Sequence, residues 1–225
     1  MIRYEDVVPW GRNFDEYCRM FNLSNEDLSK KIVGCGDGPA SFNCEAAQRG
    51  YNVISIDPIY SLTKEQIEKR IEETYNVVVE ITIKDADKFI WKNFKDINEL
   101  CETRMEAMKF FLSDYNKGLK EKRYIPGELP KLDISDNEFD IALSSHFLFL
   151  YSDNLSLDFH IESIEEMLRI SKEVRIFPIL DYCADLSKHY NEVVKYFENK
   201  VSSIIKITVD YEFQKGGNEM LKINR

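Results

Sequence analysis

The sequence predicts an α/β fold built on a mostly parallel sheet. Short apolar segments alternate with amphipathic ones along the chain, which is the pattern of a layered domain of strands and helices. A glycine-rich turn follows the first apolar segment and leads into a helix. Near the C-terminus two apolar runs are joined by Gly216-Gly217, and a hairpin of this kind makes the last part of the sheet antiparallel.

The first half of the chain contains both strand and helix candidates. In order, they are an amphipathic helix over 11–22, a strand over 31–35, a helix from Pro39 to about Gln48, a strand over 52–56 and a helix from about Thr63. The first helix places Tyr17, Met20 and Phe21 on one face. Proline suits the first turn of the second helix, and Gly50 ends it.

The second half predicts the remaining strands. They are short apolar segments at 123–125, 139–144 and 174–179, followed by the hairpin arms 204–213 and 220–223. Helices are expected over about 158–171 and 186–199. With the strands before them, these segments continue the alternation of a doubly covered sheet.

Residues 83–122 form a helical insertion that is longer than the fold needs before its third strand. Leu100, Met108 and Phe111 recur in it at helical spacing. One interpretation is an extra helical layer packed on the domain. The other is a lid that carries Met105, Met108, Phe110 and Tyr115 over an acceptor pocket.

Composition and charge exclude several classes of function. Hydrophobic residues make up 44% and charged residues 31% of the chain, as in soluble globular proteins. The net charge of −10 repels phosphate backbones, so nucleic acid is not an expected partner. No apolar run approaches the about 20 residues of a membrane span, and the N-terminus lacks a signal-peptide core. We therefore expect a cytoplasmic protein without membrane contact.

The cysteines and histidines show no ligand spacing. Five cysteines and three histidines are scattered, and no C-x-x-C pair occurs. The sequence therefore predicts neither a disulfide framework nor a metal site.

The sharpest motif is Gly34-Cys35-Gly36-Asp37-Gly38-Pro39, between a strand and a helix. Glycines let the backbone turn tightly and approach a ligand closely, and the helix N-terminus beyond them offers free N–H groups. Asp57 follows at the end of the next strand. An α/β nucleotide fold places a carboxylate there to accept the ribose hydroxyls.

The loop does not match the other nucleotide motifs. A dinucleotide fingerprint that began at Gly34 would need glycine where the chain has Pro39, and no Gly-Lys-Ser/Thr of a P-loop follows. The pattern suits a cofactor without pyrophosphate, which disfavours an NAD-linked oxidoreductase. The alternatives are a plain strand–helix turn for the glycines and an Asp-Pro turn for Asp57.

Four segments carry a family resemblance: VGCGDG at 33–38, ISIDP at 54–58, YIPGELPKL at 124–132 and NEFDIALSSHFLFLY at 137–151. With them, roughly residues 28–225 resemble the class I methyltransferases that use S-adenosylmethionine (SAM). The strings GCGDGPASFN, SHFLFLY and EFQKGG are similar to a subgroup of uncharacterised bacterial methyltransferase-like proteins. The resemblance implies one Rossmann-like domain over residues 1–225. Its seven-stranded, mostly parallel sheet would have an antiparallel C-terminal hairpin strand and helices on both faces.

The resemblance also implies a cofactor site. The implied cofactor-binding residues are Gly34, Cys35, Gly36 and Gly38 in the loop, Asp57, Pro58 and Ile59 after the second strand, Glu128 and Leu129 where the family has an acid near the adenine amino group, and Ser144 and Ser145 beside the transferred methyl. The loop would face the methionine part, Asp57 the ribose, and Pro58 and Ile59 the adenine. The family commonly has an acid where this chain has Ile32. The methionine ammonium must then be held by backbone carbonyls or by a carboxylate from elsewhere.

His146 is the candidate catalytic residue. It follows Ser144 and Ser145 at the strand end that faces the methyl in this fold. An imidazole with an ordinary pKa near 6.5 can take a proton from a hydroxyl or amine acceptor. The alternative is a structural histidine that packs under Phe147 and Phe149.

The function that these observations predict is transfer of a methyl group from SAM to a small molecule. No Pro-Pro pair follows the fourth strand and no Pro-Cys pair occurs, so the signatures of nucleic-acid methyltransferases are absent. The alternative is a non-catalytic SAM-binding partner or regulatory subunit, for which Ile32 is the main argument. The sequence names neither the acceptor nor the oligomeric state.

Overall fold

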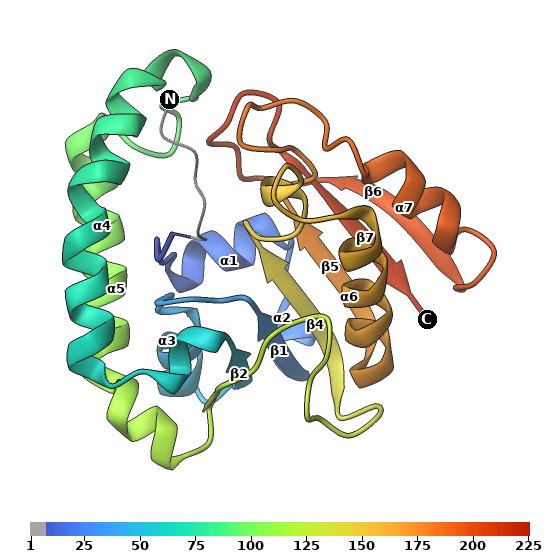
Figure 1. Ribbon diagram of the computed structural model, residues 1–225. Helices are drawn as coiled ribbons and strands as arrows, with labels where there is room; N and C mark the ends of the chain where they lie inside the picture. The colour runs from blue at the N-terminus through green and yellow to red at the C-terminus, as the bar shows by residue number, and fades with distance from the viewer. Residues whose placement is uncertain (1–7) are drawn as a thin grey trace.

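The structure, a computed structural model, describes residues 8–225 and has a seven-stranded sheet at its centre (Figure 1). The strands are β1 (Lys31–Cys35), β2 (Asn52–Ile56), β3 (Tyr124–Ile125), β4 (Phe139–Ser145), β5 (Ser171–Phe177), β6 (Ser203–Thr208) and β7 (Glu219–Asn224). Their order is β3-β2-β1-β4-β5-β7-β6. The five strands β3, β2, β1, β4 and β5 pair in parallel with their neighbours, and β7 runs antiparallel to β5 and β6. This sheet confirms the predicted Rossmann-like fold, with its seven mostly parallel strands and its antiparallel hairpin.

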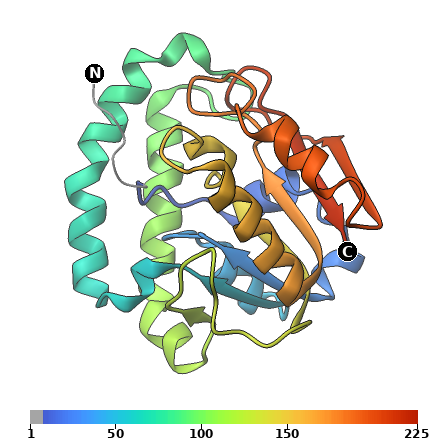
Figure 2. The same ribbon diagram turned by 45° about the vertical axis from the view of Figure 1, so that its right-hand side comes forward.

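Helices connect the strands and cover both faces of the sheet (Figure 2). They are α1 (Phe14–Met20), α2 (Asn25–Leu28), α3 (Phe42–Gln48), α4 (Lys64–Lys84), α5 (Ile97–Lys120), α6 (Leu157–Ile170) and α7 (Tyr190–Phe197). Local sequence fixes where several of them begin. The side chains of Asn13, Ser24 and Thr63 each accept a hydrogen bond from the first turn of the helix that follows. Among residues 8–225, no helix is long and apolar enough to cross a membrane.

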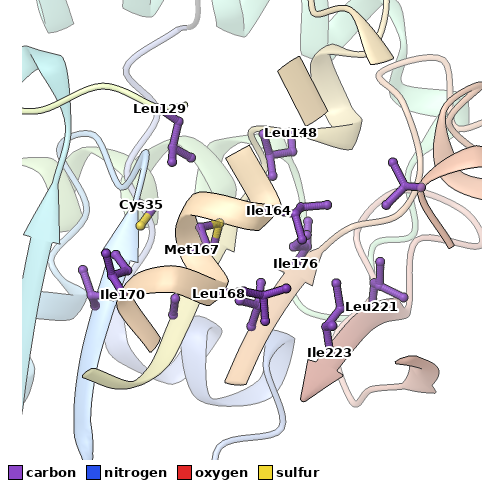
Figure 3. Packing of buried hydrophobic residues seen from close by; sticks show 14 of the residues in the cluster. Cys35, Leu129, Leu148, Ile164, Met167, Leu168, Ile170, Ile176, Leu221 and Ile223 are labelled. Carbon is purple, nitrogen blue, oxygen red and sulfur yellow. The ribbon is translucent and has the colours of Figure 1, made fainter. Parts of the chain in front are cut away.

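Strand alternation divides the core between the two faces. Val33 packs on one face with Met167 of α6 and the neighbouring apolar side chains that Figure 3 shows. Ile32 packs on the other face with Tyr17 of α1 and Phe42 of α3. All five side chains are at most 1% exposed. Because each such side chain stabilises the fold by roughly 1.5–3 kcal/mol, the apolar residue at position 32 has a structural reason.

Two strand boundaries differ from the prediction. β5 begins at Ser171 and ends at Phe177, whereas an apolar run at 174–179 was expected. Its polar start still pairs with β4, because the backbone ladder does not need apolar side chains. β6 ends at Thr208, well before the expected end at 213. The chain there leaves the sheet, and the Phe213 ring stacks on Phe89 at 4.4 Å between centroids.

The expected insertion over 83–122 is part of a pair of long helices. α4 continues to Lys84, and α5 runs beside it on one side of the molecule (Figure 1). Met108 and Tyr115 are fully buried against residues of α4 and against Tyr60. The central part of the pair is therefore the extra helical layer of the first interpretation. The end of the pair near Leu100 borders one of the cavities described below, and Arg70 of α4 lines the other.

Candidate functional site

The carboxyl ends of β1, β2 and β4 border a cavity of about 480 Å³, which we call the glycine-loop cavity. Parallel strands bring their carboxyl ends to one edge of a sheet, and ligands of open α/β sheets bind there. Of the implied cofactor-binding residues, those that line this cavity are Cys35, Gly36, Gly38, Asp57, Pro58, Ile59, Glu128, Leu129 and Ser145. Its volume lies within the range of about 300–1,000 Å³ that small-molecule sites occupy.

Asp57 lies at the end of β2 and holds two pieces of backbone in place. Its Oδ2 accepts a hydrogen bond from the Gly38 N–H at 2.9 Å, and its Oδ1 accepts one from the Ile59 N–H at 2.8 Å. A carboxylate has about four acceptor sites, so both oxygens keep capacity for ligand hydroxyls. Burial raises the pKa of this carboxyl, and the two backbone N–H groups oppose the shift.

Asp37 is a second buried carboxyl on the cavity, and the sequence did not single it out. The Tyr17 hydroxyl donates to its Oδ1 at 2.9 Å, and the Ser55 hydroxyl donates to its Oδ2 at 2.6 Å. Burial raises its pKa to about 6. A Cβ at position 34 would lie 1.9 Å from the Asp37 Oδ2 atom, so Gly34 makes room for this carboxyl. Gly34 itself does not line the cavity.

Gly36 and Gly38 carry the turn of the loop with φ angles of +75° and +55°. A Cβ at Gly36 would meet the Phe147 ring at 3.0 Å. A Cβ at Gly38 would meet no protein atom within 4 Å. A side chain at position 36 would therefore collide with Phe147, whereas at position 38 only the positive φ favours glycine.

The two serines at the end of β4 have different surroundings. Ser145 lines the glycine-loop cavity. Ser144 is fully buried and does not line it, and its Oγ has no hydrogen-bond partner within residues 8–225. The physical reason is strand alternation, which sends successive side chains to opposite faces. Ser144 and Gly34 were both expected beside the cofactor, but neither lines the glycine-loop cavity, so the structure gives these two expectations no support.

His146 lies at the junction of two cavities. Its backbone has φ +51° and its N–H donates to the Phe177 carbonyl at 2.6 Å, so the ring is held over the strand ends. The Ser145 Oγ lies 3.0 Å from Nδ1. Burial, with the positive charges of Arg12 and Arg104, holds the pKa of His146 well below its usual range. The imidazole is therefore neutral at pH 7, the form that can accept a proton.

The second cavity, about 170 Å³, is lined by aromatic rings, aliphatic side chains and a few polar groups, and we call it the aromatic cavity. Its ring-bearing residues include Trp10, Phe89, Tyr151, Phe177, Tyr211 and Phe213. The two cavities share the lining residues Val8, Trp10, Arg12 and His146. The two cavities therefore adjoin, and a molecule bound in one would lie next to a molecule bound in the other.

A buried ion pair lies at the wall of the aromatic cavity. Arg104 of α5 donates from NH1 to Glu16 Oε2 of α1 at 2.5 Å and from NH2 to the Tyr211 hydroxyl at 3.2 Å. The Tyr211 hydroxyl donates to Glu16 Oε1 at 2.8 Å. The patterns in the sequence did not predict this network. Its signal was an arginine midway between Leu100 and Met108 on the buried stripe of a helix, where an apolar residue is expected.

Comparisons with known proteins connect the chain to a relative. The "Uncharacterized protein MJ0045" of Methanocaldococcus jannaschii is 40% identical over 225 residues, which are 100% of this chain and 99% of that protein. No protein-family model matches. The relative is archaeal, so the comparison gives no support to the bacterial subgroup that the resemblance suggested.

Solved structures of similar fold also exist. One is a putative SAM-dependent methyltransferase from Methanococcus maripaludis, 13% identical, with 94% of this chain and 82% of that chain covered and a TM-score of 0.44. Another is a TehB-like SAM-dependent methyltransferase from Corynebacterium glutamicum, 13% identical, with 88% and 80% covered and a TM-score of 0.47. The likeness is one of fold alone, and the case for an activity depends on the site.

Proposed function

The chain belongs to the same family as the Methanocaldococcus jannaschii protein, and we propose that it transfers a methyl group from SAM to a small molecule. The observation that carries the proposal is the pair of adjoining cavities with His146 between them. The glycine-loop cavity has the size and lining for the cofactor. The aromatic cavity lies where an acceptor would sit.

The residues present suit the cofactor. Asp57 offers acceptor capacity to ribose hydroxyls beside the open space over Gly38. Pro58, Ile59 and Leu129 supply an apolar lining for the adenine. For the methionine ammonium, Asp37 is a carboxyl on the same cavity. It offers the charge that the chain lacks at position 32.

When bound, SAM supplies an electrophilic methyl on a sulfonium, and the protein's part is mainly to position the acceptor. His146 takes a proton if the acceptor carries one of high pKa. If Nδ1 donates to the Ser145 hydroxyl, Nε2 is free to accept that proton. The aromatic walls exclude water from the acceptor.

A non-catalytic SAM-binding subunit remains the second candidate, because position 32 lacks the family's acid. The two functions differ in turnover. We expect SAM and S-adenosylhomocysteine to raise the melting temperature, since both would bind the native state, and NAD to leave it unchanged. With a fractionated metabolite extract, we expect release of S-adenosylhomocysteine. Binding without release from any fraction would favour the second candidate, and a shift with NAD alone would overturn both.

A further inference from the structure

The aromatic cavity contains more positive charge than the protein around it neutralises. Arg12 and Arg104 both line it. Glu16 faces Arg104 as its ion-pair partner, and both side chains are at most 2% exposed. Asp85, at the other side of the cavity, pairs with Lys88 at 3.2 Å. Among the described residues, none forms an ion pair with Arg12.

The two guanidinium groups also have unused donors. The Nε atoms of Arg12 and Arg104 are buried and have no hydrogen-bond partner within residues 8–225. The one recorded hydrogen bond of the Arg12 guanidinium runs from NH1 to the Trp10 carbonyl at 2.8 Å. Buried donors on a charged group are costly to leave unpaired, so such groups normally have an acceptor. Residues 8–225 supply no such acceptor to either Nε, so a bound anion could supply it.

The position of Arg12 is fixed by its backbone. The Ser41 N–H donates to the Arg12 carbonyl at 3.0 Å, so the residue lies above the loop that ends β1. Burial, and then the charge of Arg104, lower the pKa of Arg12. An arginine nevertheless stays protonated, because its ordinary pKa is above about 12. A fixed, charged guanidinium presents the planar fork that matches a carboxylate.

The rest of the cavity limits what the anion is attached to. Most of its walls are the aromatic rings named above and aliphatic side chains such as Val78 and Ile81, with Thr82 and Gln214 as polar members. A volume of about 170 Å³ is close to that of a cavity of about 150 Å³ that holds benzene. A polar or extended body would leave groups unsatisfied against these rings. The body that fits is apolar and about the size of one ring.

We propose that the acceptor is a small carboxylic acid with an apolar or aromatic body, whose carboxylate contacts Arg12 and Arg104 in the aromatic cavity. That the bound acid is methylated rests on the proposed function, whereas its binding to the two arginines does not. The carboxylate is the anchor that fixes the molecule next to His146. Neutral molecules of the same shape lack that anchor and bind more weakly.

The test uses benzoate and benzamide as probes, which have the same shape and differ in charge. Binding to the full chain is measured by ligand-observed NMR, with and without S-adenosylhomocysteine. We expect benzoate to bind at least about tenfold more tightly than benzamide, because charge-assisted hydrogen bonds contribute that much or more. Arg12→Gln should remove the difference, and Arg12→Lys should restore part of it. Arg49→Gln, at an exposed arginine that lines neither cavity, is the matched control.

The outcomes separate the two proposals. Equal binding of benzoate and benzamide, or a preference that survives Arg12→Gln, would overturn the inference. If Arg12→Gln weakens S-adenosylhomocysteine and leaves benzoate unchanged, Arg12 serves the cofactor and the inference is also wrong. If the wild type binds benzoate by this pattern but binds no adenosyl ligand, the proposed function fails and the anion site stands.

Discussion

The glycine-loop cavity and the aromatic cavity adjoin, but they are built in different ways. Most of the first comes from strand ends and the loops that directly follow them, such as Gly36, Asp57 and Ser145. The second gathers side chains from α4, α5, the N-terminal segment and the loop between β6 and β7. Its charged wall depends on Glu16 and Arg104, which are far apart in the sequence.

This difference separates what the fold supplies from what this chain adds. A turn after a parallel strand presents backbone N–H groups wherever the fold occurs, so the first cavity follows from the topology. The second depends on long-range packing of particular side chains. Under the proposed function we therefore expect specificity for an acceptor to come from the aromatic cavity, and changes at residues that line this cavity alone should leave cofactor binding intact.

The largest expected effect is at Arg104. Arg104→Ala leaves Glu16 as a buried charge without its partner, and breaking such a pair costs about 3–5 kcal/mol of unfolding free energy. Urea denaturation measures the loss. In the molecules that remain folded, affinity for S-adenosylhomocysteine should stay within a few-fold of wild type, because Arg104 does not line the glycine-loop cavity.

A double variant tests the reason for that loss. Arg104→Met with Glu16→Gln removes both charges at similar volume, so much of the stability should return. If Arg104→Ala alone costs less than about 1 kcal/mol, the pair does not hold α1 and α5 together in the way described.

His146 has the next largest effect, on rate. With an acceptor identified, His146→Ala should lower methyl transfer by roughly a hundredfold if the acceptor loses a proton. Affinity for SAM should change by no more than a few-fold. Ser145→Ala should give a smaller loss, because it removes the partner of Nδ1 and keeps the imidazole. An unchanged rate per folded molecule would make His146 structural, with its ring packed against Phe177.

Asp57 tests the glycine-loop cavity. Two charge-assisted hydrogen bonds to a ribose contribute about 1.5–3 kcal/mol each, so Asp57→Ala should weaken SAM by at least about tenfold. Calorimetric titration measures the affinity. The variant also loses the acceptors of the Gly38 and Ile59 N–H groups, so some stability is lost too. Unchanged affinity would place the ribose elsewhere, and exposed Asp136→Ala is the control.

Local patterns explain what the sequence predicted well. The strand–loop–helix–strand unit from β1 to Asp57 can be read from residues close together in the sequence, and the structure places Gly36, Gly38 and Asp57 on one cavity. The sheet follows from the alternation of apolar segments, and the hairpin from the Gly-Gly turn. Ile32 packs against α1 and α3, which explains why position 32 is apolar. The absence of the family's acid could not by itself show this packing.

Long-range contacts explain the features that could not be predicted from the sequence. No local pattern shows that Tyr17 and Ser55 both donate to Asp37, since the three residues come from a helix, a strand and a loop. The same holds for Arg12, which looks like an ordinary polar residue before a helix. Ser144 and Ser145 are equivalent as neighbours in sequence, and the pleat of β4 alone gives them different faces.

The smallest predicted effect concerns the pH dependence of stability through Asp37. Burial raises its pKa in the folded protein to about 6, above the value of about 3.9 expected in the unfolded chain. The folded state therefore binds the proton more tightly. This group's contribution to the unfolding free energy is largest below pH 4 and is lost as pH rises through 6.

Asp37→Asn removes that dependence and retains a side chain that can accept from Tyr17 and donate to Ser55. Relative to wild type, the variant should gain on the order of 1 kcal/mol of stability between pH 5 and pH 8, measured by urea denaturation at each pH. If the Asp37 carboxylate holds the methionine ammonium, wild-type affinity for SAM should fall below pH 6, and the affinity of Asp37→Asn should be weak and independent of pH. A parallel stability profile for both proteins would show that Asp37 titrates normally. A parallel affinity profile would leave the ammonium to backbone carbonyls, and the glycine-loop cavity would then hold the methionine part by the loop alone.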